Sequence, residues 1–130
     1  MKSLKFDAIL QKFFNANLRL SEALTQPYNE YIRDSSIQRF EFTFELFWKI
    51  LRLYALRDGI EVNSPRTSIR EAFRLGLIDE EELYLAMLES RNMATHTYDE
   101  EIAEEIFQQL PNYTIAMGNT VTRIQTLIEN

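Results

Sequence analysis

The stretch from residue 28 to residue 58 constrains the fold most, because its apolar residues follow a helical period without a break. Six of them recur at steps of three and four and form one packing stripe: Ile37, Phe40, Phe44, Phe47, Leu51 and Tyr54. A second stripe lies on another side of the same predicted helix: Phe42, Leu46, Leu53 and Leu56. A helix that is apolar on two sides must be covered on two sides. One side faces a bundle core, and the other predicts a second subunit or, alternatively, a short helix of the same chain.

The remaining segments also have helical periodicity, with breaks where helix-ending or helix-starting residues occur. The breaks are expected at Gln26-Pro27, Asp58-Gly59, Ser64-Pro65 and Leu75-Gly76. Two further starts are expected: Asp79 caps one helix with Glu82 three residues later, and the next helix starts near Thr97 or Asp99, where Thr97 and Glu100 can form a capping box. Pro111 then interrupts that helix. The pattern predicts one all-α domain over residues 1–130, an antiparallel four-helix-bundle core with one or two short extra helices.

The composition of the 130-residue chain excludes several classes of site. There is no Cys and only one His, which excludes thiolate chemistry and zinc sites that need two histidines. We expect no metal and no cofactor. A net charge of −6 does not suit a DNA-coating protein, although a local basic patch could still hold a phosphate. The chain shows no signal-peptide core and no apolar stretch long enough for a membrane span, which favours a cytoplasmic protein.

The polar stretch of residues 89–100 is the first candidate site, because it joins two predicted helices and holds the only His. Arg91, Asn92, His96 and Tyr98 could converge there. Histidine exchanges protons near neutrality, and the planar arginine fork matches a phosphate and its developing charge. Such a set could cleave RNA without a metal, through attack of the ribose 2′-hydroxyl on the adjacent phosphate. Alternatively, Arg91 pairs with nearby acids and His96 caps the end of the preceding helix.

Two charged groups carry weaker signals. Arg66, Arg70 and Arg74 are spaced four apart on one predicted helix and could contact an RNA backbone, or they could form a solvated face that pairs with Glu71. An acidic run follows the His, and it could hold a metal or a basic partner or simply form a solvated helix start: Asp99, Glu100, Glu101, Glu104 and Glu105.

Several strings in this order resemble one protein family. They are Arg39-Phe40-Glu41-Phe42-Thr43-Phe44-Glu45-Leu46-Phe47-Trp48-Lys49, Ser64-Pro65-Arg66, Glu71-Ala72-Phe73, Gly76-Leu77-Ile78 and Met87-Leu88-Glu89-Ser90-Arg91-Asn92. Arg91, His96 and Tyr98 add an R-x4-H-x-Y pattern. Together they resemble the HEPN superfamily, specifically its HepT-like toxins and a branch described as nucleotidyltransferase substrate-binding proteins. The resemblance runs from about Phe6 to Ile128.

The resemblance implies a homodimer whose two motifs meet at a shared cleft, with an RNA substrate. It implies that Arg91 and His96 carry metal-independent RNA cleavage, with Asn92 in support. It also implies a partner, a minimal nucleotidyltransferase antitoxin that transfers AMP to Tyr98 and silences the toxin. The alternative that it leaves open is a non-catalytic subunit that presents substrate to a nucleotidyltransferase.

Overall fold

The computed structural model describes residues 4–129, and every regular element in that range is helical. The α-helices are α1 (Leu4–Leu24), α2 (Glu30–Arg57), α3 (Pro65–Arg74), α4 (Glu81–Met93) and α5 (Glu100–Glu129). A short 3₁₀ helix, η1 (Ala94–His96), separates α4 from α5. The predicted all-α bundle with short extra elements is thus confirmed. Within the described range, no helix is long and apolar enough to cross a membrane.

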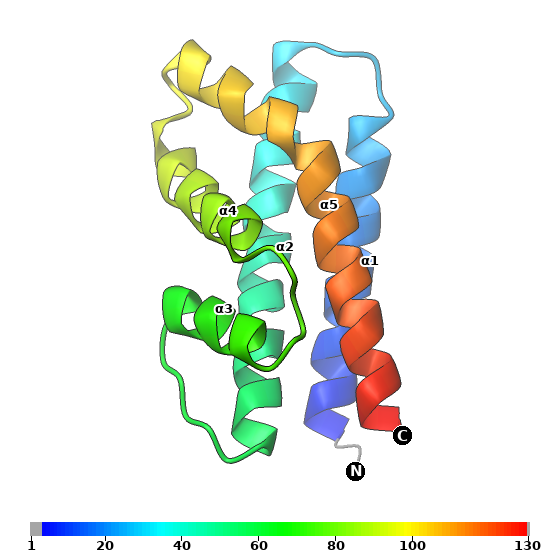
Figure 1. The fold of residues 1–130 in the computed structure, drawn as a ribbon. Helices are drawn as coiled ribbons and strands as arrows, with labels where there is room; N and C mark the ends of the chain where they lie inside the picture. Colours follow the sequence, from blue (N-terminus) through cyan, green and yellow to red (C-terminus); the bar gives the residue numbers. More distant parts are fainter. Residues whose placement is uncertain (1–3, 130) are drawn as a thin grey trace.

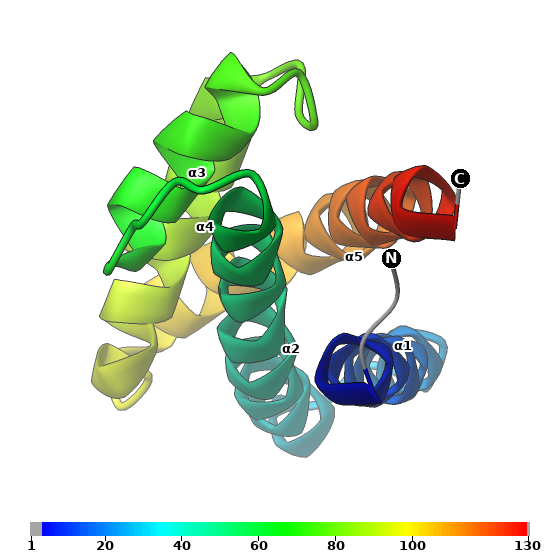
Figure 2. The same cartoon turned by 90° about the horizontal axis from the view of Figure 1, so that it is seen from below.

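Helix α2 is the central element, because it packs against each of the other helices. Figures 1 and 2 show α1 and α5 side by side along one flank of α2, while α3 and α4 lie on the other flank. The first five members of the long apolar stripe on α2 are at most 1% exposed, and they run from Ile37 to Leu51. Full burial of such side chains stabilises the fold by about 1.5–3 kcal/mol each, so this stripe organises the core.

Aromatic contacts join α2 to three of its neighbours. Phe47 lies 6.2 Å from Phe13 of α1 and stacks at 5.7 Å on Tyr84 of α4, both between ring centroids. Phe40 lies 5.4 Å from Tyr113 of α5. Because ring pairs at these separations are attractive beyond their buried area, the two flanks of the fold are held to the same helix.

The second apolar stripe of α2 is only half covered by the chain itself. Leu46 and Leu53 are partly buried against the core, whereas Phe42 is 59% and Leu56 is 52% exposed. The helices of the same chain therefore account for two members of the stripe and leave the other two in solvent.

Most of the predicted helix ends are confirmed. Helix α1 ends at Leu24, two residues before the break predicted at Gln26-Pro27, which is within the usual uncertainty of a helix end. The turns after α2 and α3 contain Gly59 and Gly76, with φ of 79° and 76°. These are left-handed conformations that glycine adopts without a steric penalty. Helix α3 begins with a reciprocal capping box in which Ser64 and Thr67 exchange side chain-to-backbone hydrogen bonds.

The predicted cap of α4 is wrong. The helix begins at Glu81, so Glu80 rather than Asp79 occupies the cap position, and its side chain makes no capping hydrogen bond. A capping oxygen reaches the free N–H groups only from the residue directly before the helix. The Asp79–Glu82 spacing therefore starts one residue too early.

Of the two predicted starts of α5, near Thr97 or near Asp99, the one at Asp99 is confirmed, whereas the capping box of Thr97 with Glu100 does not form. The carboxylate of Asp99, not Thr97, caps the helix, since its Oδ1 accepts hydrogen bonds from the N–H groups of Glu101 at 3.0 Å and Ile102 at 3.3 Å. An aspartate at this position satisfies free N–H groups and faces the positive end of the helix dipole. Asp99 therefore fixes the direction in which the chain enters α5.

Pro111 does not interrupt the last helix, contrary to the prediction. Helix α5 is continuous from Glu100 to Glu129 with Pro111 inside it, and Figure 1 shows the helix bending along its course. Proline removes one backbone hydrogen bond and usually kinks a helix. Here Pro111 is exposed while its neighbour Leu110 is buried. Packing on both sides of the bend thus outweighs the lost bond.

Candidate functional site

His96 and Tyr98 form a bonded pair in the turn between α4 and α5. The Nδ1 atom of His96 lies 2.9 Å from the hydroxyl oxygen of Tyr98, and the two rings meet edge to face at 5.7 Å. Tyr98 is 82% exposed, and His96 is also exposed. When the phenol donates this hydrogen bond, the imidazole carries its proton on Nε2. The pair therefore presents a proton-exchanging group and a hydroxyl to solvent together.

Arg91 lies in the last turn of α4 and turns toward α2. Its Nη1 atom is 3.7 Å from a carboxylate oxygen of Glu45, and its guanidinium carbon is 5.8 Å from the centre of the Phe44 ring. The Nε atom is buried and has no hydrogen-bond partner among the described residues. A second carboxyl nearby belongs to Glu41, whose pKa is raised by burial, with Arg91 opposing the rise. Arg91 is thus loosely tied, with donors still available.

The four side chains of the polar stretch are only partly brought together. His96 and Tyr98 are in contact, but within residues 4–129 no hydrogen bond or ion pair links Arg91 to His96. Asn92 is exposed, and only its backbone carbonyl is engaged, by the hydroxyl of Thr95 at 3.5 Å. The alternative interpretation of the stretch is met in one of its two parts. Arg91 pairs with an acid, although this acid is Glu45 of α2, whereas His96 bonds to Tyr98 rather than to helix carbonyls.

The three arginines of α3 differ in their surroundings. Arg74 pairs with Glu71, which its Nε atom meets at 2.8 Å. Arg66 and Arg70 are exposed, and in the described part of the chain they have no ion-pair or hydrogen-bond partner. The interpretation of a solvated helix face that pairs with Glu71 thus applies to Arg74, whereas Arg66 and Arg70 remain unpaired in the described part of the chain.

Two members of the acidic run at the start of α5 lie beside a buried arginine that sequence reasoning missed. Arg33 of α2 is only 4% exposed and lies 2.9 Å from Asp34, 3.6 Å from Glu100 and 3.9 Å from Glu104. The Tyr28 hydroxyl donates to Glu104 at 2.5 Å. Among the described residues, no cluster of His, Asp or Glu is arranged to hold a metal ion.

These contacts also shift two pKa values. The hydrogen bond with Asp34 raises the pKa of Arg33 further, despite its burial. The hydrogen bond from Tyr28 lowers the pKa of the Glu104 carboxyl, with smaller help from Gln108 and Arg33. Both shifts favour the charged forms. The ion pairs of Arg33 with Glu100 and Glu104 join α2 to the beginning of α5, just after Tyr98.

A signal for Arg33 was present in the sequence. Arg33 stands four residues before Ile37, which places it on the extension of the buried stripe of α2. A cation on a core face must find anions, since a buried charge is costly unless it is paired. The acidic run of residues 99–105 offers those anions.

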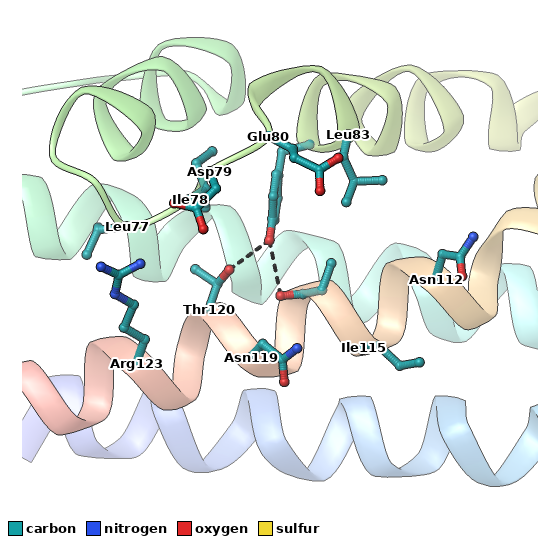
Figure 3. A pocket seen from close by; sticks show the side chains of 12 residues that line it. Leu77, Ile78, Asp79, Glu80, Leu83, Asn112, Ile115, Asn119, Thr120 and Arg123 are labelled. Carbon is teal, nitrogen blue, oxygen red and sulfur yellow. Dashed lines mark hydrogen bonds between the residues drawn. The ribbon is translucent and has the colours of Figure 1, made fainter.

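A groove of about 530 Å³ lies away from this turn, between α5 and the segment that joins α3 to α4 (Figure 3). Asp79 and Glu80 line one wall, and Asn119 and Arg123 line the other. Tyr84 closes the base, where its hydroxyl bonds to Thr120 at 2.8 Å and to a backbone carbonyl of α5. Neither Arg91 nor His96 lines the groove.

Trp48 lies one turn along α2 from Glu45, the residue that pairs with Arg91. It is 9% exposed, and its indole N–H has no hydrogen-bond partner in the part of the chain that is described. It is the only tryptophan in the sequence.

Comparison with known proteins places this arrangement in context. Residues 8–126 match the family described as "Nucleotidyltransferase substrate binding protein like". A curated relative from Haemophilus influenzae, named "Probable ribonuclease HepT", is 33% identical over 85 residues. That match spans 62% of this chain and 58% of the relative, so it covers little more than half of the curated protein's length.

Two solved structures have a similar fold. One, from Thermus thermophilus, has a TM-score of 0.82 at 38% identity and covers 85% of this chain and 97% of its own. The other, from Haemophilus influenzae, is described as revealing "the fold of a substrate binding domain of a nucleotidyltransferase". Its TM-score is 0.69 at 25% identity, with 92% of this chain and 96% of that chain covered.

Proposed function

Because the chain belongs to the HepT-like family of nucleotidyltransferase substrate-binding proteins, we propose that it is an RNA-cleaving toxin silenced by a partner nucleotidyltransferase. The observation that carries the proposal is the 2.9 Å bond between His96 and Tyr98, at the exposed end of the helix that bears Arg91. One short segment thereby offers a proton acceptor, a phosphate-binding cation and a hydroxyl that can be modified.

The cleavage step uses His96 as the base and Arg91 as the phosphate-binding cation. In the tautomer whose Nδ1–H donates to the Tyr98 oxygen, the free Nε2 of His96 takes the proton of the ribose 2′-hydroxyl. The 2′-oxygen attacks the adjacent phosphorus, and the 5′-oxygen leaves with a proton from water. The products are a cyclic phosphate and a free 5′-hydroxyl. Arg91 stabilises the charge that develops on the phosphoryl oxygens, and Asn92 supports it with its amide. Because the contact of Arg91 with Glu45 is long and partly exposed, the RNA phosphate displaces it at low cost.

A second copy of the chain completes the site in this proposal. The exposed Phe42 lies on α2 three residues before Glu45, so a partner that covers Phe42 and Leu56 also approaches Arg91. Burial of two large apolar side chains per subunit favours such association. A shared cleft then holds two copies of Arg91 and His96.

The partner nucleotidyltransferase silences the toxin at Tyr98. The phenolic oxygen attacks the α-phosphate of ATP, pyrophosphate leaves, and the phenol proton passes to His96 through the existing hydrogen bond. The attached AMP adds bulk and a negative charge beside Arg91, where it competes with the RNA phosphate. Modification therefore blocks substrate by volume and by charge.

The test is cleavage of a labelled single-stranded RNA in the presence of EDTA. Wild-type protein should cleave, whereas His96→Ala should lose activity by roughly 10²–10⁴-fold, the usual contribution of acid–base catalysis. Arg91→Ala should lose roughly 10²–10³-fold, the usual cost of removing a group that stabilises the developing charge. Arg123→Ala serves as the control, because it removes an exposed arginine on α5 that lines the distant groove. Cleavage that is equal in all four proteins would assign the activity to a contaminant.

The second candidate function is a non-catalytic subunit that presents substrate to a nucleotidyltransferase. The family description favours it, and so does the orientation of Arg91 toward Glu45 instead of His96. Stable binding of the nucleotidyltransferase without cleavage of RNA by purified wild-type protein would support this candidate over the first.

A further inference from the structure

The outward face of α3 carries two cations and an uncovered aromatic ring. Arg66, Arg70 and Phe73 stand at steps of four and three, so they share one face of the helix. Both arginines are exposed, and Phe73 is 45% exposed. We call these three residues the α3 strip.

The charge of the α3 strip is not neutralised by the protein. Glu71 is the only acid within α3, and it is engaged by Arg74. In the described range, Arg66 and Arg70 have no anionic partner, and no arginine lies over the Phe73 ring. A chain of net charge −6 therefore keeps a small positive surface beside an open aromatic face.

We propose that the α3 strip binds single-stranded RNA, an inference that rests on the proposed function of the chain. Arginines one helical turn apart can each hold a phosphate of one strand, and their charge is complementary to it. An open phenylalanine ring stacks on an unpaired base, whatever its identity. A duplex offers the phosphates but keeps its bases stacked inside, so the ring selects for a single strand.

The position of α3 fits this role. Helix α3 packs against α4, and in both Figure 1 and Figure 2 its first turn lies nearer than its last turn to the C-terminal end of α4. Arg66 belongs to that first turn, and Arg91 belongs to the C-terminal end of α4. A strand held along the α3 strip from Phe73 to Arg66 is therefore directed toward Arg91.

The experiment measures binding separately from cleavage. A fluorescent single-stranded RNA is titrated with the full chain carrying His96→Ala, so that the RNA stays intact, and anisotropy gives Kd at several salt concentrations. In that background, Arg66→Gln with Arg70→Gln should reduce the slope of log Kd against log salt by roughly 0.7 for each lost phosphate contact. Phe73→Leu, which keeps an apolar side chain but removes the stacking ring, should weaken binding by about five-fold or more.

One control and the outcomes decide the proposal. Arg123→Gln should leave Kd nearly unchanged, since this exposed arginine lies on α5, outside the α3 strip. Unchanged Kd and salt slope in the α3 strip variants would overturn the proposal even if wild-type protein cleaves RNA, and would leave an acidic protein surface as the partner. Strip-dependent binding by a wild-type chain that does not cleave would uphold the α3 strip and reject the proposed cleavage.

Discussion

Replacement of Arg33 by methionine removes the cation between α2 and the start of α5 while it keeps an unbranched side chain of similar length. Only the contact with Asp34, at 2.9 Å, has hydrogen-bond length; Glu100 and Glu104 lie at 3.6 and 3.9 Å. All three carboxylates are at least 41% exposed, so water solvates them once the cation is gone.

The expected loss therefore corresponds to a hydrogen bond to a charged group, about 1.5–3 kcal/mol. It stays below the ~3–5 kcal/mol that follows when one member of a buried pair is removed and the other charge is left buried. With an unfolding entropy of about 2.1 cal/mol/K per residue, a chain of 130 residues should lose roughly 5–11 °C in Tm.

Thermal unfolding followed by circular dichroism measures this loss, and hydrogen exchange locates it. Amides at the start of α5 should exchange faster in Arg33→Met, because Glu100 and Glu104 lose their longer contacts with Arg33 of α2. Arg52→Met is the matched control, since Arg52 is an exposed arginine of α2 without an ion-pair partner among the described residues. A Tm equal to that of Arg52→Met, or faster exchange spread evenly over the chain, would refute the reasoning.

Three further predictions concern the assembly, the modification and the pH dependence. Phe42→Glu places a charge on the exposed stripe of α2 and should convert a two-copy species into a monomer in analytical ultracentrifugation; a monomeric wild type would contradict the dimer. Tyr98→Phe lacks the acceptor oxygen, so mass spectrometry after incubation with the nucleotidyltransferase and ATP should show no added AMP, and a persistent mass gain would move the modification elsewhere. The lowered pKa of Glu104 means that its stabilising contribution is complete above its ordinary value of 4.5 and is lost as the pH falls through the lower value in the folded state. In urea titrations, the difference in free energy of unfolding between wild type and Glu104→Gln should shrink below about pH 4.5; a growing difference would reverse the assigned sign.

The helical core could be predicted from the sequence because its signal is periodic and local. Every member of the series from Ile37 to Leu51 is buried, as the spacing indicated. Two errors have a common cause, since Pro111 and Asp79 were assigned from local rules for breaks and caps. In the structure, buried side chains on both sides of Pro111 stabilise α5 as one continuous helix. Helix α4 begins at Glu81, so Asp79 lies one residue before the cap position.

The candidate site was predictable only where its contacts are local. His96 and Tyr98 are two residues apart, and their contact follows from a single turn. The direction of Arg91 depends on Glu45 in a helix that lies far away in sequence, so spacing along the chain holds no information on it. Whether the Phe42 side chain is buried likewise depends on which other helices or subunits pack against α2, and the periodicity of α2 alone does not describe that packing.

The lone Trp48 gives this protein a built-in optical reporter. Indole emission changes with polarity and with nearby charge, and here the ring is almost buried on α2, one turn from the carboxylate that holds Arg91. If an RNA phosphate displaces Glu45 from Arg91, the electric field around this ring changes, whereas occupation of the α3 strip alone leaves Arg91 untouched. A change in tryptophan emission on titration with unlabelled RNA therefore reports displacement of Glu45 at the end of α4, without a dye or a tag.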